Sequence, residues 1–98
     1  MQKFEFIYPM IIGAPEHHGV YLLYLDDTLI YIGRAAGTDV TIKSRLSSHF
    51  SGEEGNCTAS ATHYGWEISN SPILLERELL QTYQNRFGSL PACNDRIG

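Results

Sequence analysis

The chain is short of positive charge. Its 98 residues include seven lysines and arginines against eleven aspartates and glutamates, so the formal net charge is −4. Proteins that bind nucleic acid unaided are usually basic, because contacts to phosphate dominate their affinity. The charge balance therefore argues against tight, unaided binding of nucleic acid, unless the few basic groups gather on one face or a partner holds the substrate.

Long apolar stretches are also missing. No run approaches the ~18 apolar residues of a membrane-spanning helix, and the first six residues include Lys3 and Glu5 where a signal peptide has its apolar core. We therefore expect no membrane association and a cytoplasmic location. The apolar fraction of 43% and the charged fraction of 18% are typical of a globular protein. The length predicts one domain over residues 1–98.

Cysteine is scarce as well, since Cys57 and Cys93 are the two in the chain and lie far apart in it. In a cytoplasmic protein such cysteines are usually reduced, and we expect both to be reduced here. Two alternatives stay open. One is a zinc site with His63 and a second histidine, although the spacing matches no common pattern of zinc ligands. The other is a disulfide.

Hydrophobic patterning predicts a small α/β domain with a central, three-stranded, mostly antiparallel sheet flanked by helices. Residues 19–25 are apolar on both faces, which is typical of a central strand. The expected elements are strands at 19–25, 29–34 and 62–69 and helices at 40–51 and 72–87, with residues 3–8 suited to an edge strand. Thr38 or Asp39 is the expected cap of the first helix, and Gly88 is expected to stop the second.

Two tripeptides in the first two predicted strands carry the most specific signal. Gly19-Val20-Tyr21 and Tyr31-Ile32-Gly33 each set a tyrosine beside a glycine, and Arg45 and Glu76 follow on the predicted helices. This order resembles the GIY-YIG nuclease family over most of the chain. Members of that family cut nucleic-acid phosphodiesters with one divalent metal ion. The resemblance implies a GIY-YIG-like fold, a Mg²⁺ or Mn²⁺ cofactor and a nucleic-acid substrate, which we expect to be DNA.

Both tyrosines must share one face of the sheet if they serve one site. Side chains alternate across a strand, so a slip of one residue moves a side chain to the opposite face. A three-residue loop pairs Leu25 with Leu29, places Tyr21 opposite Gly33 and keeps Tyr31 on the face of Tyr21. A two-residue turn separates the tyrosines, so the resemblance predicts the three-residue loop. Considered separately, each tyrosine is also consistent with an ordinary aromatic residue of a strand, and this is the alternative to a functional role.

The first helix and the end of the second strand supply the basic candidates. Arg45 and His49 are one turn apart beside the apolar stripe of Ile42 and Leu46, so we expect them to project together from the border of the buried face. By resemblance, Arg45 contacts the scissile phosphate and Arg34 the phosphate backbone. A surface salt bridge is the alternative for Arg45. His49 is either a phosphate ligand, a proton relay or a packing residue.

Glu76 is the strongest candidate on physical grounds alone. On a helical wheel it falls inside the apolar arc, between Tyr83 and Phe87, whereas Glu78 points to the solvated side. An ionised carboxylate on an apolar face is destabilising unless it is paired or bound to a metal. We therefore predict Glu76 as the ligand of Mg²⁺ or Mn²⁺, which favour oxygen donors. The alternative is a buried ion pair, for instance with Arg45.

Asn94, after Pro91 in the tail, resembles the family's terminal Pro-x-x-Asn element, although it lies further from Glu76 than in the excision-repair members. Its alternative role is to cap backbone groups of the tail. The complete set of candidate site residues is Tyr21, Tyr31, Arg34, Arg45, His49, Glu76 and Asn94.

The resemblance implies a metal-dependent endonuclease in which Tyr21 helps to activate the attacking water and Tyr31 orients water or phosphate. The acidic net charge supports a second hypothesis, a non-catalytic nucleic-acid- or protein-binding module on the same fold, and suggests a helper protein that holds the substrate. The oligomeric state stays open. A single positive patch beside Tyr21 would favour the nuclease, and its predicted members are Arg34, Lys43, Arg45 and His49.

Overall fold

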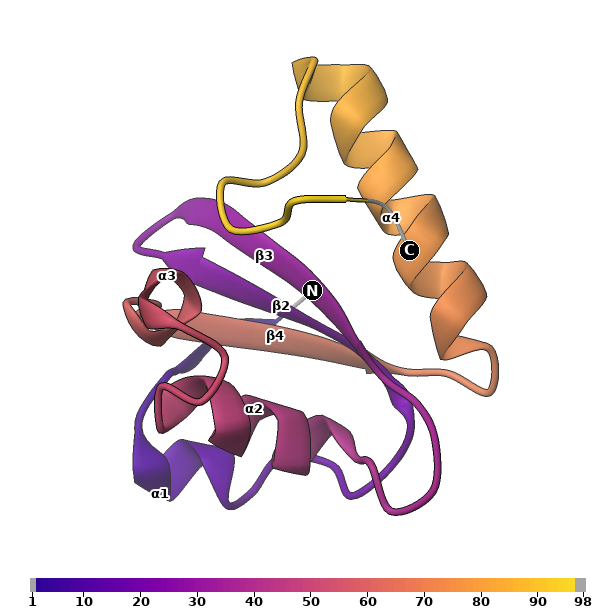
Figure 1. Cartoon of the computed structure of the whole chain (residues 1–98). Helices are drawn as coiled ribbons and strands as arrows, with labels where there is room; N and C mark the ends of the chain where they lie inside the picture. The colour runs from indigo at the N-terminus through magenta and orange to yellow at the C-terminus, as the bar shows by residue number, and fades with distance from the viewer. Residues whose placement is uncertain (1, 97–98) are drawn as a thin grey trace.

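A computed structural model describes residues 2–96 of the chain (Figure 1). Within this range, four strands form one antiparallel sheet in the order β1-β4-β2-β3. The strands are β1 (Phe4–Glu5), β2 (Gly19–Leu25), β3 (Thr28–Ala35) and β4 (His63–Ile68). The small α/β class is confirmed, but the prediction of a three-stranded sheet is wrong. The segment suited to an edge strand pairs with β4 as the fourth strand, and it is only two residues long because the chain soon enters a helix.

Helices cover both sides of the sheet. The longer ones, α2 (Ile42–Phe50) and α4 (Pro72–Phe87), lie close to their predicted ranges. Two single-turn helices, α1 (Tyr8–Ile11) and α3 (Asn56–Ala59), are additional to the predicted elements, and α1 begins within the segment suited to an edge strand. Four residues are too few for a periodic pattern to show. In the described part of the chain, no helix has the length and apolar character needed to cross a bilayer.

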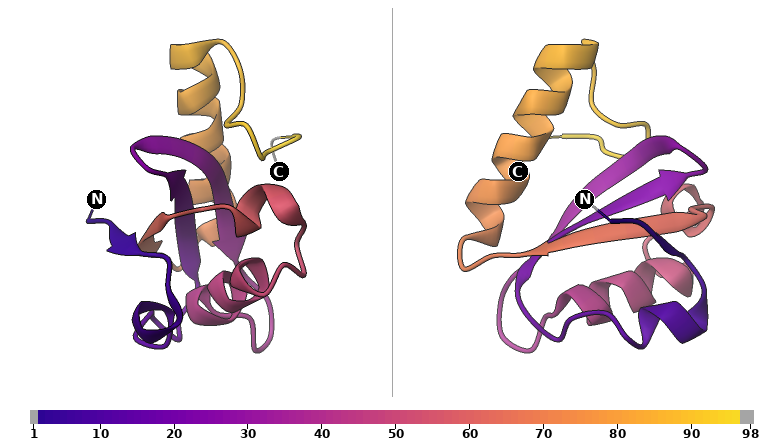
Figure 2. Two further views of the ribbon diagram at one scale, coloured as in Figure 1. Left: turned by 90° about the vertical axis from the view of Figure 1, so that its left-hand side faces the viewer. Right: turned by 180° about the vertical axis from the view of Figure 1, so that it is seen from behind.

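The sheet separates two apolar clusters of unequal size. α1 and α2 lie on one face and α4 on the other, as the two views of Figure 2 show. β2 runs between β3 and β4 and sends successive side chains to opposite faces, which explains its continuous apolar sequence. The larger cluster, beneath α1 and α2, includes Ile11, Tyr21, Leu23, Ile42, Leu46 and Tyr64. The smaller one, beneath α4, includes Leu22, Ile32 and Leu80.

The β2–β3 hairpin places Tyr21 and Tyr31 on the same face, as predicted, but for a different reason. The loop has two residues rather than three, because Leu25 pairs directly with Thr28. A register shift directly after Leu23 then adds one residue to β3. Such a bulge changes the alternation by one position. It therefore restores the shared face that a two-residue turn alone would have removed.

The ends of the long helices agree in part with the prediction. Thr41, rather than Thr38 or Asp39, caps α2, since its hydroxyl accepts the Ser44 backbone N–H at 3.0 Å. The Ser44 hydroxyl accepts the Thr41 N–H at 2.9 Å in return, and this reciprocal capping box starts the helix at residue 42. α4 stops at Gly88 as predicted, where the backbone turns to a φ of 81°.

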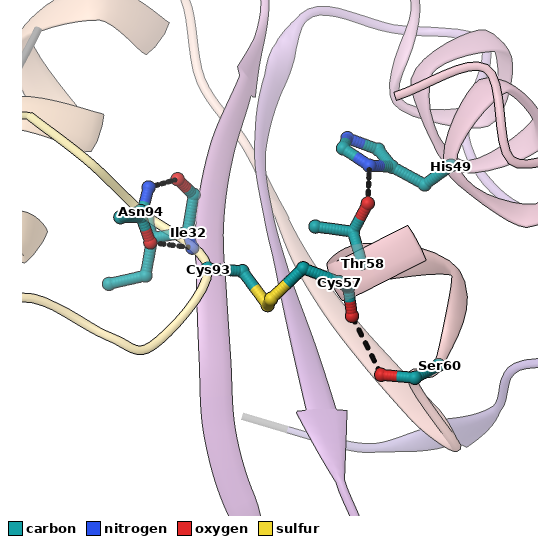
Figure 3. The surroundings of a disulfide bond; sticks show 7 residues. All are labelled: Ile32, His49, Cys57, Thr58, Ser60, Cys93 and Asn94. Carbon is teal, nitrogen blue, oxygen red and sulfur yellow. Dashed lines mark hydrogen bonds between the residues drawn. A yellow bond between two sulfur atoms is a disulfide. The ribbon is translucent and has the colours of Figure 1, made fainter. Parts of the chain in front are cut away.

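Cys57 and Cys93 are joined in a disulfide, so the expectation that both are reduced is wrong (Figure 3). Their Cα atoms lie 5.8 Å apart although 36 positions separate them in the chain. The bond links α3 to the C-terminal tail after α4. Only the folding of β4 and α4 between them brings the two cysteines together. The zinc alternative falls away, since the two sulfurs are bonded to each other.

Candidate active site

Two tyrosines from neighbouring strands meet on the α2 side of the sheet. Tyr21 is 1% exposed and lies opposite Gly33, and its ring centroid is 6.1 Å from that of Tyr31. Burial raises the pKa of both phenols. The nearby Tyr31 adds to the rise at Tyr21 while Arg45 opposes it, and Glu76 adds to the rise at Tyr31. Both hydroxyls are therefore protonated at neutral pH, and neither acts as an ionised base by itself.

Gly33 must be a glycine because the two tyrosine rings lie against its backbone. A Cβ added there would lie 2.7 Å from Tyr31 Cε2 and would overlap the end of the Tyr21 ring. Gly19 is constrained in the same way, since its Cβ would overlap the Glu67 carbonyl on the adjacent strand. Each tripeptide glycine thus permits a close approach that no other residue allows.

Behind Tyr21 stands a second buried polar side chain, His49 of α2, which is 1% exposed. Its Nε2 lies 2.8 Å from the Tyr21 hydroxyl, and its Nδ1 lies 2.7 Å from the Thr58 hydroxyl of α3. Burial lowers the pKa of His49 to about 4, helped by the charge of Arg45, so the ring is neutral at pH 7. The predicted position at the border of the buried face is wrong. The ring lies in the core, which removes direct phosphate binding and leaves a proton relay or packing.

Arg45 projects from α2 and forms a salt bridge with Glu54, with 2.8 Å between Nη2 and Oε1. The predicted alternative of a surface salt bridge is therefore present. Burial works to lower the pKa of Arg45, but the hydrogen bond to Glu54 and the proximity of Tyr21 raise it overall. The two side chains are 27% and 35% exposed, and pairs this accessible contribute little stability. An incoming anion can therefore replace Glu54 at small cost.

Glu76 of α4 is buried as predicted, with 7% of its surface exposed. Its Oε1 lies 2.9 Å from Nη1 of Arg34, at the end of β3. The predicted alternative of an ion pair is therefore present, but the partner is Arg34 and not Arg45. Glu78, two positions further along α4, is exposed as expected. The helical wheel thus identifies the buried carboxylate, whereas its partner comes from a strand that the wheel does not describe.

Asn94 has its side chain fully engaged with the edge of the sheet (Figure 3). Its Oδ1 accepts the Ile32 N–H at 2.9 Å and its Nδ2 donates to the Ile32 carbonyl at 3.0 Å. Cys93 adds a backbone bond from its N–H to the Ile30 carbonyl at 2.8 Å. β3 lies at the edge of the sheet, where outward backbone groups need such partners. Asn94 therefore caps backbone groups, those of β3 rather than of the tail.

One cavity of about 400 Å³ collects the predicted residues beside the outer edge of β3, which the tail covers. The tyrosines reach it from the α2 side of the sheet, whereas α4 contributes Glu76 from the other side. The site therefore spans the sheet edge and not only the face that carries the tyrosines. The predicted residues that line it are Tyr21, Tyr31, Arg34, Arg45, Glu76 and Asn94, and His49 lies behind Tyr21.

Four polar residues of this region do not emerge from sequence reasoning. Glu54 and Thr58 lie in a stretch of small and polar residues that has no periodic pattern, and Asp95 and Arg96 line the cavity from the tail. None of them occupies a motif position. The one indication in the sequence is that Thr58 directly follows a cysteine. That position becomes informative only when the disulfide is known.

The predicted positive patch is present only in part. Arg34 and Arg45 line one cavity, but each is paired with a carboxylate. Lys43 is not part of the cavity lining and lies 3.5 Å from Glu16. His49 is neutral. Two of the three arginines that line the cavity therefore lie in ion pairs, which a phosphate would have to enter.

No protein-family model, curated protein or solved structure matches the chain. Its function has therefore to be inferred from the chemistry of the cavity.

Proposed function

We propose that this chain is a metal-dependent endonuclease of the GIY-YIG type, which hydrolyses phosphodiester bonds of DNA. One observation carries the proposal. Four side chains from four different elements line the same cavity. They are the tripeptide tyrosines of β2 and β3, an arginine of α2 and a buried glutamate of α4. These elements are distant in the chain, so a chance match of the tripeptides gives no reason for the four side chains to converge.

Tyr21 and His49 together can take a proton from an attacking water. The raised pKa of Tyr21 keeps its hydroxyl protonated, and the neutral His49 ring is in reach to accept that proton at Nε2. The water proton then passes to the Tyr21 oxygen. This requires the tautomer in which His49 Nδ1–H donates to Thr58. The opposite tautomer would have Nε2–H donate to Tyr21 and would block the transfer.

Arg45 supplies the cation that a pentacovalent phosphate needs. Its guanidinium lies in the cavity wall close to Tyr21, so a phosphate attacked by a Tyr21-bound water lies within its reach. Exchange of Glu54 for the phosphate keeps Arg45 paired throughout. Arg34 and Arg96 line the same cavity, and in this proposal they meet neighbouring phosphates.

Glu76 is the side chain that would hold the divalent ion. Within residues 2–96, no cluster of three or more histidine, cysteine or carboxylate side chains is placed for a metal, so the ion would combine one carboxylate with water and phosphate oxygens. Mg²⁺ accepts such a set. Glu76 lines the cavity and offers the hard oxygen donor required. When bound, the ion would supply Lewis-acid stabilisation of the phosphoryl oxygen, and Arg34 would exchange its bond to Glu76 for one to phosphate.

A second candidate, a non-catalytic binding module, is favoured by the ion pairs in the cavity. Arg34 and Arg45 each already have a carboxylate partner, and the net charge is −4. A helper protein that presents the DNA would remove this difficulty for the nuclease. The cytoplasmic location remains part of the proposal. A disulfide in that compartment is uncommon and usually serves catalysis or redox sensing.

Cleavage of labelled duplex, branched and single-stranded DNA at low salt with Mg²⁺ tests the proposal. Glu76→Gln is the informative variant, and Glu78→Gln, an exposed glutamate on the same helix, is its matched control. We expect cutting by the wild type and by Glu78→Gln, and a loss of about 100-fold or more in Glu76→Gln.

The melting temperature with and without Mg²⁺ completes this test. A rise that the wild type shows and Glu76→Gln lacks places the ion at Glu76. Absence of cutting on every substrate, together with an unchanged melting temperature, rejects the nuclease and supports the binding module.

A further inference from the structure

The disulfide joins two short segments that each hold part of the candidate site. Cys57 is the second residue of α3, a helix of four residues, and Cys93 lies in the irregular tail after α4. Each cysteine is followed directly by a residue that hydrogen-bonds a part of the site, Thr58 after Cys57 and Asn94 after Cys93 (Figure 3). The bond therefore connects, through single peptide links, two segments that we call walls of the site: α3, which contacts His49 behind the cavity, and the tail, which lines the cavity.

The α3 wall controls His49. Thr58 is 3% exposed, and its hydroxyl lies 2.7 Å from His49 Nδ1, while the other ring nitrogen lies 2.8 Å from the Tyr21 hydroxyl. A helix of one turn does not hold its position by its own hydrogen bonds. Its place against α2 therefore depends on what ties it down, and the disulfide is a covalent tie within one residue of Thr58.

The tail wall follows β3. Asn94 bonds both backbone groups of Ile32 and thereby continues the sheet edge, and Arg96, two residues on, reaches the cavity. The tail has no regular structure of its own between α4 and its end at the cavity. Cys93 fixes the point at which the tail meets the edge of the sheet.

We propose that the Cys57–Cys93 disulfide is a covalent brace that positions both walls of the candidate site, and that its reduction by a dithiol switches the site to a less active state. The activity part of this proposal rests on the proposed function. The positional part does not, because it concerns Thr58, His49 and the tail irrespective of what the cavity binds. A disulfide that only stabilises the fold would leave these positions unchanged in protein that is still folded.

The chemistry of the switch is a thiol–disulfide exchange with a dithiol as reductant. One thiolate of the dithiol attacks the sulfur of Cys57, because Cys57 is exposed. Cys93 leaves as a thiolate, and a mixed disulfide forms between the dithiol and Cys57. The second thiol of the dithiol then attacks the mixed disulfide and releases Cys57. Two electrons pass to the protein, both cysteine sulfurs end as thiols with one proton each, and the dithiol becomes a cyclic disulfide.

The test compares the oxidised chain, the chain reduced with dithiothreitol, and the double variant Cys57→Ala/Cys93→Ala. The ¹⁵N resonances of the His49 ring report its hydrogen bonds, and far-UV circular dichroism reports the fold. We expect one protonated and one unprotonated ring nitrogen, well separated, in the oxidised chain and averaged resonances in the other two. We expect kcat for DNA cleavage to fall about 10- to 100-fold at little change in KM.

Two further variants separate positioning from general stability. Thr58→Val keeps the disulfide and removes only the bond to His49, so it should reproduce the change in the ring resonances. Tyr64→Phe loses a 2.8 Å bond to the Met10 carbonyl, outside the cavity lining, and should change neither readout. If the reduced chain and the double variant do not fold, the His49 resonances of Thr58→Val still show whether α3 positions the ring through Thr58.

The outcomes discriminate between the two proposals. Averaged His49 resonances on reduction, with no cleavage by any form, uphold the brace and count against the nuclease. Unchanged resonances in folded, reduced protein, or cleavage that is equal in both redox states, overturn the brace and leave the nuclease standing. Unchanged resonances in Thr58→Val also overturn it, since the α3 wall would then not act through Thr58.

Discussion

Protonation of His49 should destabilise the fold at mildly acidic pH. The ring lies between Tyr21 and Thr58 with 1% exposure, and Arg45 faces it from its own helix. Its pKa falls from 6.5 in the unfolded chain to about 4 in the folded protein. Between these values the unfolded chain binds a proton that the folded protein excludes. Stability from this group is therefore complete above pH 6.5 and is lost as the pH falls to 4.

The size of the effect follows from the two pKa values. The difference between 6.5 and about 4 corresponds to about 3.4 kcal/mol, at about 1.36 kcal/mol for each pKa unit. The charge of Arg45 supplies part of the shift, and because the Arg45 side chain is 27% exposed, solvent screening weakens that part. We therefore expect a loss of about 2–3 kcal/mol in the free energy of unfolding between pH 6.5 and pH 4.

Urea unfolding followed by circular dichroism, at a series of pH values between these limits, measures this loss. His49→Gln removes the titrating ring and keeps a polar side chain, so its free energy of unfolding should depend less on pH by the expected amount. Carboxylates titrate in both proteins and cancel in the comparison. His17→Gln, at an exposed position, is the control for removing a histidine.

Parallel curves for the wild type and His49→Gln would refute the reasoning. A titration of the His49 ring by NMR gives the same answer without a variant. A pKa near its ordinary value of 6.5 would mean that the ring reaches solvent and that the relay with Tyr21 is not formed as described.

Two further predictions concern the walls of the cavity. Gly33→Ala should displace the Tyr21 ring and lower both the melting temperature and any cleavage of DNA. Gly13→Ala is the control, because a new Cβ there meets only the Met10 carbonyl at 3.5 Å, and it should melt like the wild type. Equal melting temperatures of the two variants would contradict the close approach of Tyr21 to Gly33. Arg34→Gln should lower the free energy of unfolding by about 1–3 kcal/mol, because it leaves the buried Glu76 carboxylate unpaired. Adding Glu76→Gln should restore part of that loss in a double-mutant cycle, and strictly additive effects would show that the pair is not coupled.

The hairpin shows how a sound inference from sequence can rest on the wrong local cause. Side-chain alternation and the need for one shared face lead correctly to Tyr21 opposite Gly33. The sequence Asp26-Asp27 does not reveal that the turn has two residues and that a bulge compensates for it. A bulge depends on how both strands pack against their neighbours, and no single segment contains that information.

The two long helices also show which features a local pattern predicts and which depend on contacts between segments. A helical wheel of residues 72–87 identifies Glu76 as buried and Glu78 as exposed, because the period of a helix is fixed by its backbone geometry. The wheel of α2 places His49 only at the border of the apolar stripe. In the fold, α3 packs against α2 and covers that border, so His49 becomes a core residue with Thr58 as partner.

Local pattern alone determined the central strands, the two long helices and the burial of Glu76, whereas the shared face of the tyrosines also depends on the bulge between β2 and β3. Each of the first three depends on alternation or helical period within one segment. Only the tertiary structure decided the fourth strand, the partners of Arg34 and Arg45, the engagement of Asn94 and the Cys57–Cys93 bond. These are contacts between segments far apart in the chain, and the free energy that selects them comes from packing the whole domain at once.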